Sequence, residues 1–265
     1  SAVVPNMLLP ESGWFTVDYK KASEILKDVF KNYKNYIDKA KKQSYISRID
    51  FNLEKMAEKL NLIIEEKVPI VFTSAGNPKT WTSVLKDAGC VAVHVVSSAQ
   101  FALKAEAAGC DAVVAEGFEA GGHNGREETT TMVLIPMVCK AVSIPVIAAG
   151  GIATGAQMLA AFALGAEGVQ IGSRFVCSTE ATSHINFKNA IIEAKEGDTE
   201  LGLKLLAPVR LLKNKFANEI LTIEKQGASK EVLAEKLAKG RAKKGMFEGD
   251  MENGELEIGQ VSAMI

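Results

Sequence analysis

The chain has 265 residues, 47% hydrophobic and 24% charged, which suits one large globular domain with its own core. A formal net charge of -1 gives no electrostatic reason to expect nucleic acid or an anionic membrane as partner, and no apolar run approaches the ~20 residues that cross a bilayer. The four cysteines lack CxxC spacing, which argues against a zinc site or a disulfide framework and favours a reducing, cytoplasmic setting.

The first sixty residues differ from the rest of the chain. Residues 20–43 predict an amphipathic, Lys-rich surface helix, residues 45–53 a strand and residues 53–66 a helix. The start carries no basic region ahead of an apolar stretch, so we expect no signal peptide. No pair of opening strands with glycine-rich ends is recognisable here.

From about residue 60, short apolar runs alternate with helical stretches. The runs are rich in β-branched residues and Ala without polar alternation, which is typical of parallel strands covered on both faces. The predicted strands are 69–73, 91–96, 112–115, 145–149 and 168–171, and the predicted helices between them are 80–88, 98–108, 131–141 and 155–164. Repeating βα units predict either a doubly wound sheet or a (β/α)8 barrel.

Polar and glycine residues follow the C-terminal ends of several of these strands. A doubly wound sheet concentrates its ligand groups at one switch point, whereas a barrel gathers loops from all its strands around one mouth. We therefore predict an α/β fold of the TIM (β/α)8-type parallel barrel, with its first strands unrecognised or missing.

After residue 178 the pattern changes to helices rich in Lys, Glu and Ala, with a break at 208–210 and a glycine-rich tail over 239–265. We expect one domain in three parts. Residues 1–60 form a divergent N-terminal part of the barrel, 61–178 its strands and active-site loops, and 179–265 a helical decoration with a closing segment.

Two short glycine segments, Gly150-Gly151 and Gly172-Ser173, each follow a predicted strand. Backbone N–H groups at such turns and at helix N-termini can hold a phosphate without a side chain in the way. In barrels, the loops after the last two strands are the usual phosphate site. The alternative is that these glycines only make tight βα turns, but two consecutive strands ending this way favour a phosphate.

His123 is the strongest candidate for chemistry among the three histidines. It lies among Gly121, Gly122 and Gly125, in a loop after the strand 112–115, where core packing does not explain it. This position suits an acid, a base or a hydrogen-bond donor near neutral pH. The other two have plainer interpretations: His94 lies inside an apolar strand, where an inward-facing ring could still approach a ligand, and His184 is a surface or cap residue.

Other chemistries find no support in the sequence. Three histidines without close spacing leave no metal shell, so we predict no metal site. There is no GxSxG elbow for a nucleophilic Ser and no cysteine with a positioned His. By elimination, the reactive group belongs to a phosphate-bearing cofactor that the protein positions.

Five segments in order, AEGFEAGGHNG, TTTMVLIP, SIPVIAAGGIATG, ALGAEGVQIGSRF and PVRLLKNKF, closely resemble the nitronate monooxygenase (2-nitropropane dioxygenase-like) family. The resemblance runs over residues 63–265, and the same superfamily contains flavin-dependent enoyl-acyl-carrier-protein reductases. It implies a TIM barrel, non-covalent FMN and a small-molecule substrate at the barrel mouth. It also implies the residue roles: His123 as the active-site histidine, Gly150, Gly151, Gly172 and Ser173 at the flavin phosphate, Glu116 and Gly122 near the isoalloxazine ring, and Asn52 as the third-strand asparagine.

The N-terminus departs from the family pattern. The family opens with a strand ending in a QGGM-like segment and a second glycine-rich strand, and residues 1–44 match neither. A substitute strand or a partner chain in a homodimer would then close the barrel.

Three functions remain open. The first is an FMN-dependent nitronate monooxygenase that converts alkyl nitronates or nitroalkanes to carbonyl compounds and nitrite. The second is an FMN-dependent enoyl reductase using NAD(P)H, and the third is a non-catalytic relative that binds a ligand or a partner. The stretch GREETTTMVLIP favours the first.

Overall fold

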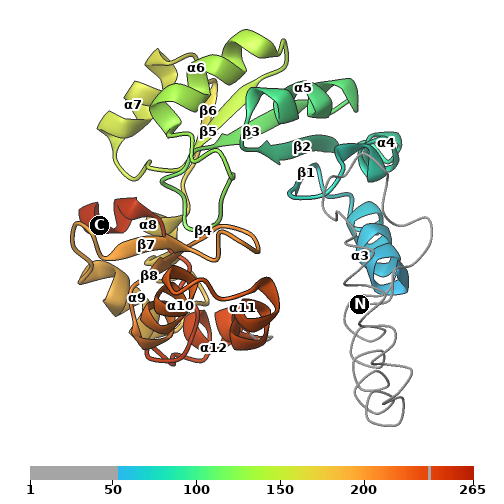
Figure 1. Cartoon of the computed structure of the whole chain (residues 1–265). Helices are drawn as coiled ribbons and strands as arrows, with labels where there is room; N and C mark the ends of the chain where they lie inside the picture. The colour runs from blue at the N-terminus through green and yellow to red at the C-terminus, as the bar shows by residue number, and fades with distance from the viewer. Residues whose placement is uncertain (1–52, 238–239) are drawn as a thin grey trace. The chain divides into compact units, whose positions relative to one another are not determined.

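The computed structural model describes residues 53–237 and 240–265 (Figure 1). The chain divides into two compact units, Ser1–Pro69 and Ile70–Ile265. The described part of the first unit is helix α3, Leu53–Glu65, which confirms the helix predicted for 53–66. The predicted helix 20–43, almost all of the predicted strand 45–53, and Asn52 lie outside the described residues.

The second unit is built around a five-stranded parallel sheet of order β1-β2-β3-β5-β6. The strands are β1 Ile70–Thr73, β2 Val91–Val96, β3 Ala112–Glu116, β5 Val146–Ala149 and β6 Gly168–Gln170. Each strand pairs in parallel with the next of the set along the chain, and the order never reverses. A doubly wound sheet reverses at its switch point, so this order is that of a barrel wall. The predicted α/β fold of TIM-barrel type is confirmed.

The crossover helices cover one face of this sheet, and Figure 1 shows α5, α6 and α7 on the same side of it. They are α4 Thr82–Asp87, α5 Ala99–Ala107, α6 Thr131–Ala141 and α7 Gly155–Ala163. Their apolar sides pack on the sheet to form the largest core cluster, which includes Val113, Ala148, Leu134, Ile135 and Val138. Each fully buried Val, Leu or Ile side chain stabilises such a core by about 1.5–3 kcal/mol.

Short-range signals explain where these helices begin and end. Ser98 caps α5 by accepting from the N–H of Phe101, and Thr154 forms a capping box with Gln157 at the start of α7. After α5, Gly109 takes a left-handed φ of +88°, the conformation that a glycine C-cap supplies. The helix predicted for 80–88 is in fact split into a 3-10 turn, η1 Pro78–Thr80, and α4, because Asn77 caps η1 separately.

A second, antiparallel sheet of order β4-β8-β7 lies in the same unit. Its strands are β4 Gly122–His123, β7 Thr199–Gly202 and β8 Val209–Leu212. The prediction of helices alone after residue 178, with a break at 208–210, was therefore wrong in part: Val209 and Arg210 begin a fully buried strand. The helices of this region are α8 Ser173–Val176, α9 Ile185–Ile192, α10 Lys215–Lys225, α11 Lys230–Leu237 and α12 Arg241–Met246, and the chain closes with the 3-10 helix η2 Gln260–Met264.

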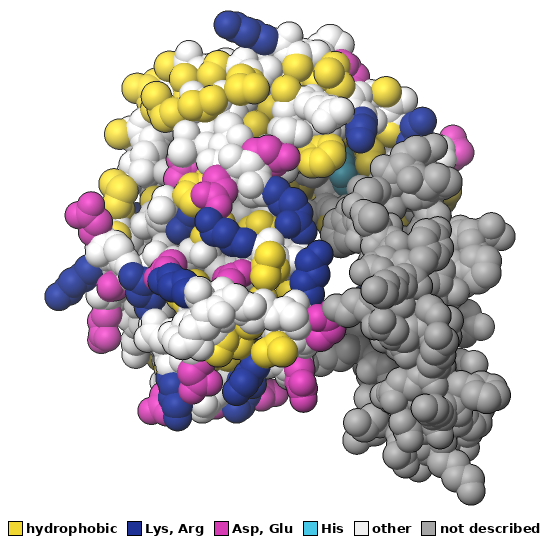
Figure 2. All heavy atoms as spheres, in the orientation of Figure 1, with side chains coloured by type: hydrophobic (Ala, Val, Ile, Leu, Met, Phe, Trp, Pro, Cys, Tyr) yellow, Lys and Arg dark blue, Asp and Glu magenta, His cyan; other side chains and the backbone are white. Residues whose placement is uncertain are grey.

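The outer surface of α6 and α7 is apolar. Figure 2 shows hydrophobic side chains gathered over these helices. The exposed members are Met132, Val133, Met137, Met158, Leu159 and Phe162. Within the described residues, no helix combines the length and apolarity that crossing a membrane requires.

Candidate active site

A cavity of about 190 Å³ lies at the C-terminal ends of β3, β5 and β6. Because carboxyl ends of parallel strands meet at one edge of the sheet, the residues following these strands converge there. Five residues that the sequence predicts for the cofactor line this cavity: Glu116, Gly150, Gly151, Gly172 and Ser173. The remaining wall includes the loop 119–121, Ile152, Met246 and the C-terminal segment 257–259.

Gly150 and Gly151 form a tight turn after β5 with left-handed φ values of +88° and +69°. A Cβ on Gly150 would lie 2.7 Å from the carbonyl oxygen of Gly117, and one on Gly151 would lie 3.3 Å from Cβ of Glu119. The tight-turn interpretation therefore accounts for Gly150 without any ligand. It does not account for the glycine after β6.

Gly172 offers open backbone at the start of α8. It is the N-cap of that helix, no side chain caps it, and a Cβ there would meet no atom within 4 Å. The first N–H groups of a helix have no partner inside the helix, so these donors suit an anion. The start of α7 is different, because Gln157 Oε1 already accepts from the N–H groups of Ala153 and Thr154. The α8 end is thus the part of the cavity that fits a phosphate.

Three carboxyl groups line the cavity, and they differ in their partners. Glu119 is held by Thr131, whose N–H and Oγ1 donate to Glu119 Oε2 at 3.0 and 2.9 Å. Within the described part of the chain, no hydrogen bond reaches the carboxyl of Glu116 or Glu257. Burial raises the pKa of Glu116 to about 7. It also raises the pKa of Glu257, against the opposing influence of nearby His123.

His123 lies on the short strand β4 and not in a loop as predicted, because Gly122 and His123 pair with Arg210 and Val209 of β8. Its side chain is exposed, and neither His123 nor Gly122 lines the cavity. Glu257 lies next to both strand β4 and the cavity. It lines the cavity, and a Cβ on Gly122 would lie 2.7 Å from Glu257 Oε2. The carboxyl group of Glu257 therefore stands between β4 and the cavity.

Arg210 anchors the loop that leads from Glu116 to His123. Its side chain is 2% exposed, and its Nε and Nη2 donate to the carbonyl oxygen of Phe118 at 3.2 and 3.0 Å. The guanidinium also lies 4.5 Å from the centre of the Phe118 ring. Asn124 closes the other end of the loop by donating to the carbonyl oxygens of Ala120 and Gly122.

The other two histidines are structural. His94 is buried, its Nδ1 lies 2.7 Å from Thr73 Oγ1, and burial lowers its pKa. His184 caps α9 by accepting from the N–H of Asn186, in agreement with its prediction as a cap residue. Across residues 53–237 and 240–265, no three His, Cys, Asp or Glu side chains come together in a group that could hold a metal ion.

The sequence patterns did not indicate three residues of this site: Glu119, Arg210 and Glu257. A charged residue inside the apolar run Val-Arg-Leu-Leu was a signal for a buried Arg210. Glu257 alternates with apolar residues in Leu-Glu-Ile, but nothing local indicates that it faces Gly122.

A barrel-type α/β protein with a ligand cavity at the carboxyl ends of its strands is the class that this fold and site define. A family model described as nitronate monooxygenase matches residues 15–265, and the chain belongs to this family. A probable nitronate monooxygenase of Bacillus subtilis (strain 168) is 38% identical over 183 residues, which cover 66% of this chain and 53% of that protein. One from Staphylococcus saprophyticus is 36% identical over 64% of this chain and 54% of its own length. The chain thus spans about half the length of the curated relatives it matches.

Solved structures agree with the family assignment. FabK from Thermotoga maritima is 44% identical with a TM-score of 0.72, covering 78% of this chain and 65% of that chain. A nitroalkane oxidase from Streptomyces ansochromogenes is 31% identical with a TM-score of 0.63, covering 78% and 62%. The resemblance predicted from the sequence is confirmed.

Proposed function

We propose that this chain acts as an FMN-dependent nitronate monooxygenase, which oxidises alkyl nitronates and nitroalkanes to carbonyl compounds and nitrite. Family membership supports the class of oxidoreductase. The observation that carries the proposal is the uncapped start of α8 beside the acidic wall of the cavity. Gly172 and Ser173, at this helix start, line the same cavity as Glu116, whose pKa burial raises to about 7.

Each residue of the site has a proposed role that follows from its position. The N–H groups that begin at Gly172 and Ser173 would hold the phosphate of FMN, while Gly150 and Gly151 shape the neighbouring wall. FMN, when bound, supplies the electron-accepting and oxygen chemistry that no side chain here provides. His123 would donate to the nitro group or take a proton from a neutral nitroalkane. Glu116 would lie near the ring system, where its raised pKa reduces the repulsion of an anionic substrate.

An absorption spectrum and three assays test this proposal. We expect flavin bands in the purified protein or after incubation with FMN, and release of nitrite from ethyl nitronate or nitroethane with uptake of oxygen. Oxidation of NADH that depends on crotonyl thioester, without nitrite release, would instead favour the enoyl reductase. Absence of flavin binding at micromolar FMN would favour the non-catalytic relative.

Three further expectations stay predictions. They are the cytoplasm as the compartment, a homodimer, and the division of the domain into residues 1–60, 61–178 and 179–265.

A further inference from the structure

Glu257 is brought beside His123 by their common neighbour, strand β8. One edge of β8 pairs with β7 along its whole length. Its other edge is shared: Val209 and Arg210 pair with β4, and the next residue, Leu211, forms an antiparallel bridge to Glu257. The segment carrying Glu257 therefore lies along the same edge of β8, next to Gly122 at the start of β4.

The side chain of Glu257 uses the space that Gly122 leaves. A Cβ at Gly122 would approach Glu257 Oε2 to 2.7 Å and Cδ to 3.5 Å, so a side chain there would push the carboxyl group out of its present position. Gly122 also has a left-handed φ of +75°, which again favours glycine. The carboxyl group lies beside the backbone of Gly122, and within the described residues it accepts no hydrogen bond.

Among the described residues, His123 is the basic side chain whose charge would act on Glu257. The cavity wall contributes two more acids, Glu116 and Glu119, and the C-terminal segment contributes Glu255. Arg210, which pairs with Gly122 in the sheet, donates hydrogen bonds from its guanidinium to the carbonyl oxygen of Phe118. His123 lowers the pKa of Glu257, which burial raises, so the carboxylate and the ring attract each other.

We infer that Glu257 is a positioning residue for His123. When His123 removes a proton from the α-carbon of a neutral nitroalkane, Glu257 stabilises the protonated imidazole ring. This inference rests on the proposed function. In that step the C–H bond breaks, its electron pair stays on the substrate as the nitronate, and an N–H bond forms on the imidazole. A carboxylate at Glu257 would balance the new positive charge without changing its own protonation. A preformed nitronate needs no such step.

The kinetic test compares Glu257→Gln with wild type on nitroethane and on ethyl nitronate. We expect kcat/KM for nitroethane to fall roughly tenfold or more, and kcat/KM for ethyl nitronate to change less than about twofold. Glu248→Gln, which removes the exposed partner of Lys243, is the matched control for loss of one carboxylate. Flavin content and circular dichroism check that Glu257→Gln is folded and loaded. Equal losses on both substrates, or no loss on either, would overturn the inference.

A second measurement does not depend on activity. The carboxyl carbon of Glu257 is titrated by NMR in the flavin-free full chain, with and without His123→Ala. We expect the pKa of Glu257 to rise in the variant, because the ring that lowers it is gone. An unchanged titration overturns the pairing even if the enzyme is active. If wild type turns over neither substrate, the proposed function fails while this titration still decides whether the two residues interact.

Discussion

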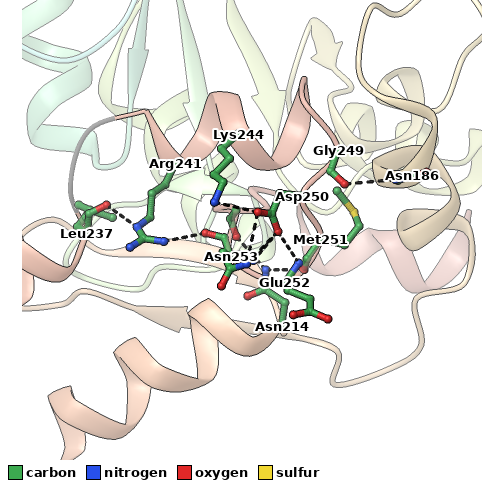
Figure 3. Close-up of polar contacts among 11 residues, drawn as sticks. Asn186, Asn214, Leu237, Arg241, Lys244, Gly249, Asp250, Met251, Glu252 and Asn253 are labelled. Carbon is green, nitrogen blue, oxygen red and sulfur yellow. Dashed lines mark hydrogen bonds and ion pairs between the residues drawn. The ribbon is translucent and has the colours of Figure 1, made fainter.

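Glu116 in the cavity and Asp250 in the C-terminal turn differ in their hydrogen-bond partners and in the direction in which their pKa is shifted. Asp250 follows α12, and its Oδ1 accepts from the N–H groups of Glu252 and Asn253 at 3.1 and 2.8 Å (Figure 3). Its Oδ2 lies 2.9 Å from Lys244 Nζ. The hydrogen bond from Asn253, followed by Lys244, holds the pKa of Asp250 well below its usual range. Glu116 has no such partner in the described chain, and burial raises its pKa to about 7.

Neighbouring side chains extend the contrast. Arg241 donates to the carbonyl oxygens of Leu237 and Asn253, and Asn214 at the start of α10 donates to those of Met251 and Gly254 (Figure 3). The C-terminal turn thus uses its hydrogen-bonding capacity on the protein itself, which joins α10, α12 and the last segment. In the cavity, by contrast, Glu119 is bonded to Thr131 but the carboxyl groups of Glu116 and Glu257 accept no hydrogen bond within the described residues. A buried polar group without a hydrogen-bond partner destabilises the fold unless a ligand or a proton binds to it. Such groups in the cavity indicate that the cavity is the functional region.

The strongest test of the contrast is His123→Ala. We expect turnover of neutral nitroalkane to fall by roughly two to four orders of magnitude, the usual effect of losing a positioned acid or base. Because the side chain is exposed, the urea midpoint should hardly move and FMN should remain bound. Steady-state kinetics at matched flavin content measure the effect, and unchanged turnover would remove His123 from the mechanism.

Gly172→Asp tests whether the first N–H groups of α8 bind the phosphate of FMN. The backbone tolerates a side chain there, with φ of −95° and open space at Cβ, but the carboxylate would repel a phosphate. We expect FMN to bind roughly tenfold to a hundredfold more weakly while the urea midpoint stays within error. Gly172→Ala is the control and should retain FMN. Gly151 is less suitable, because its φ of +69° strains any side chain whether or not a phosphate is near. Normal FMN affinity in Gly172→Asp would move the phosphate elsewhere.

Glu116→Gln measures what the cavity acid costs the fold. A raised pKa means that the folded state prefers the neutral acid. The penalty is therefore absent below pH 4.5, grows as the pH rises towards 7 and is complete above it. The neutral variant should be more stable than wild type by roughly 2 kcal/mol at pH 8 in the flavin-free state, with the difference vanishing near pH 4. Urea unfolding at both pH values decides this, and a pH-independent difference would contradict the assignment.

Asp250→Asn is the counterpart in the C-terminal turn and should show the smallest effect. Here the folded pKa is depressed, so the charge stabilises the fold above the ordinary value of 3.8 and loses this effect as the pH falls further. We expect a lower Tm for the variant at pH 7 and a smaller gap at pH 3. Glu248→Gln, an exposed pair with Lys243, should change Tm less. A gap that widens on acidification would reverse the sign we assign.

The predicted strands and helices of the parallel sheet were found within one or two residues of their predicted bounds, save where helix 80–88 was split. Strands buried on both faces are uniformly apolar, so their signal is local. The hairpin β7–β8 was not predicted, because the charged residues in Thr-Glu-Leu-Gly and Val-Arg-Leu-Leu are typical of solvent-exposed segments. The carbonyl oxygen of Phe118, distant in sequence, accepts two hydrogen bonds from Arg210 and so compensates for its burial.

The sequence by itself determined the βα order and the cluster of Glu116, Gly150, Gly151, Gly172 and Ser173 at one edge, because strand ends are visible locally and parallel strands bring them together. Tertiary structure alone decided which of these groups is free to act. It gave Gly150 a structural reason in its contact with Gly117, left Gly172 open, and set Glu257 against Gly122. The reason is that hydrogen-bond satisfaction and burial depend on segments far apart in the chain, and no local pattern encodes them.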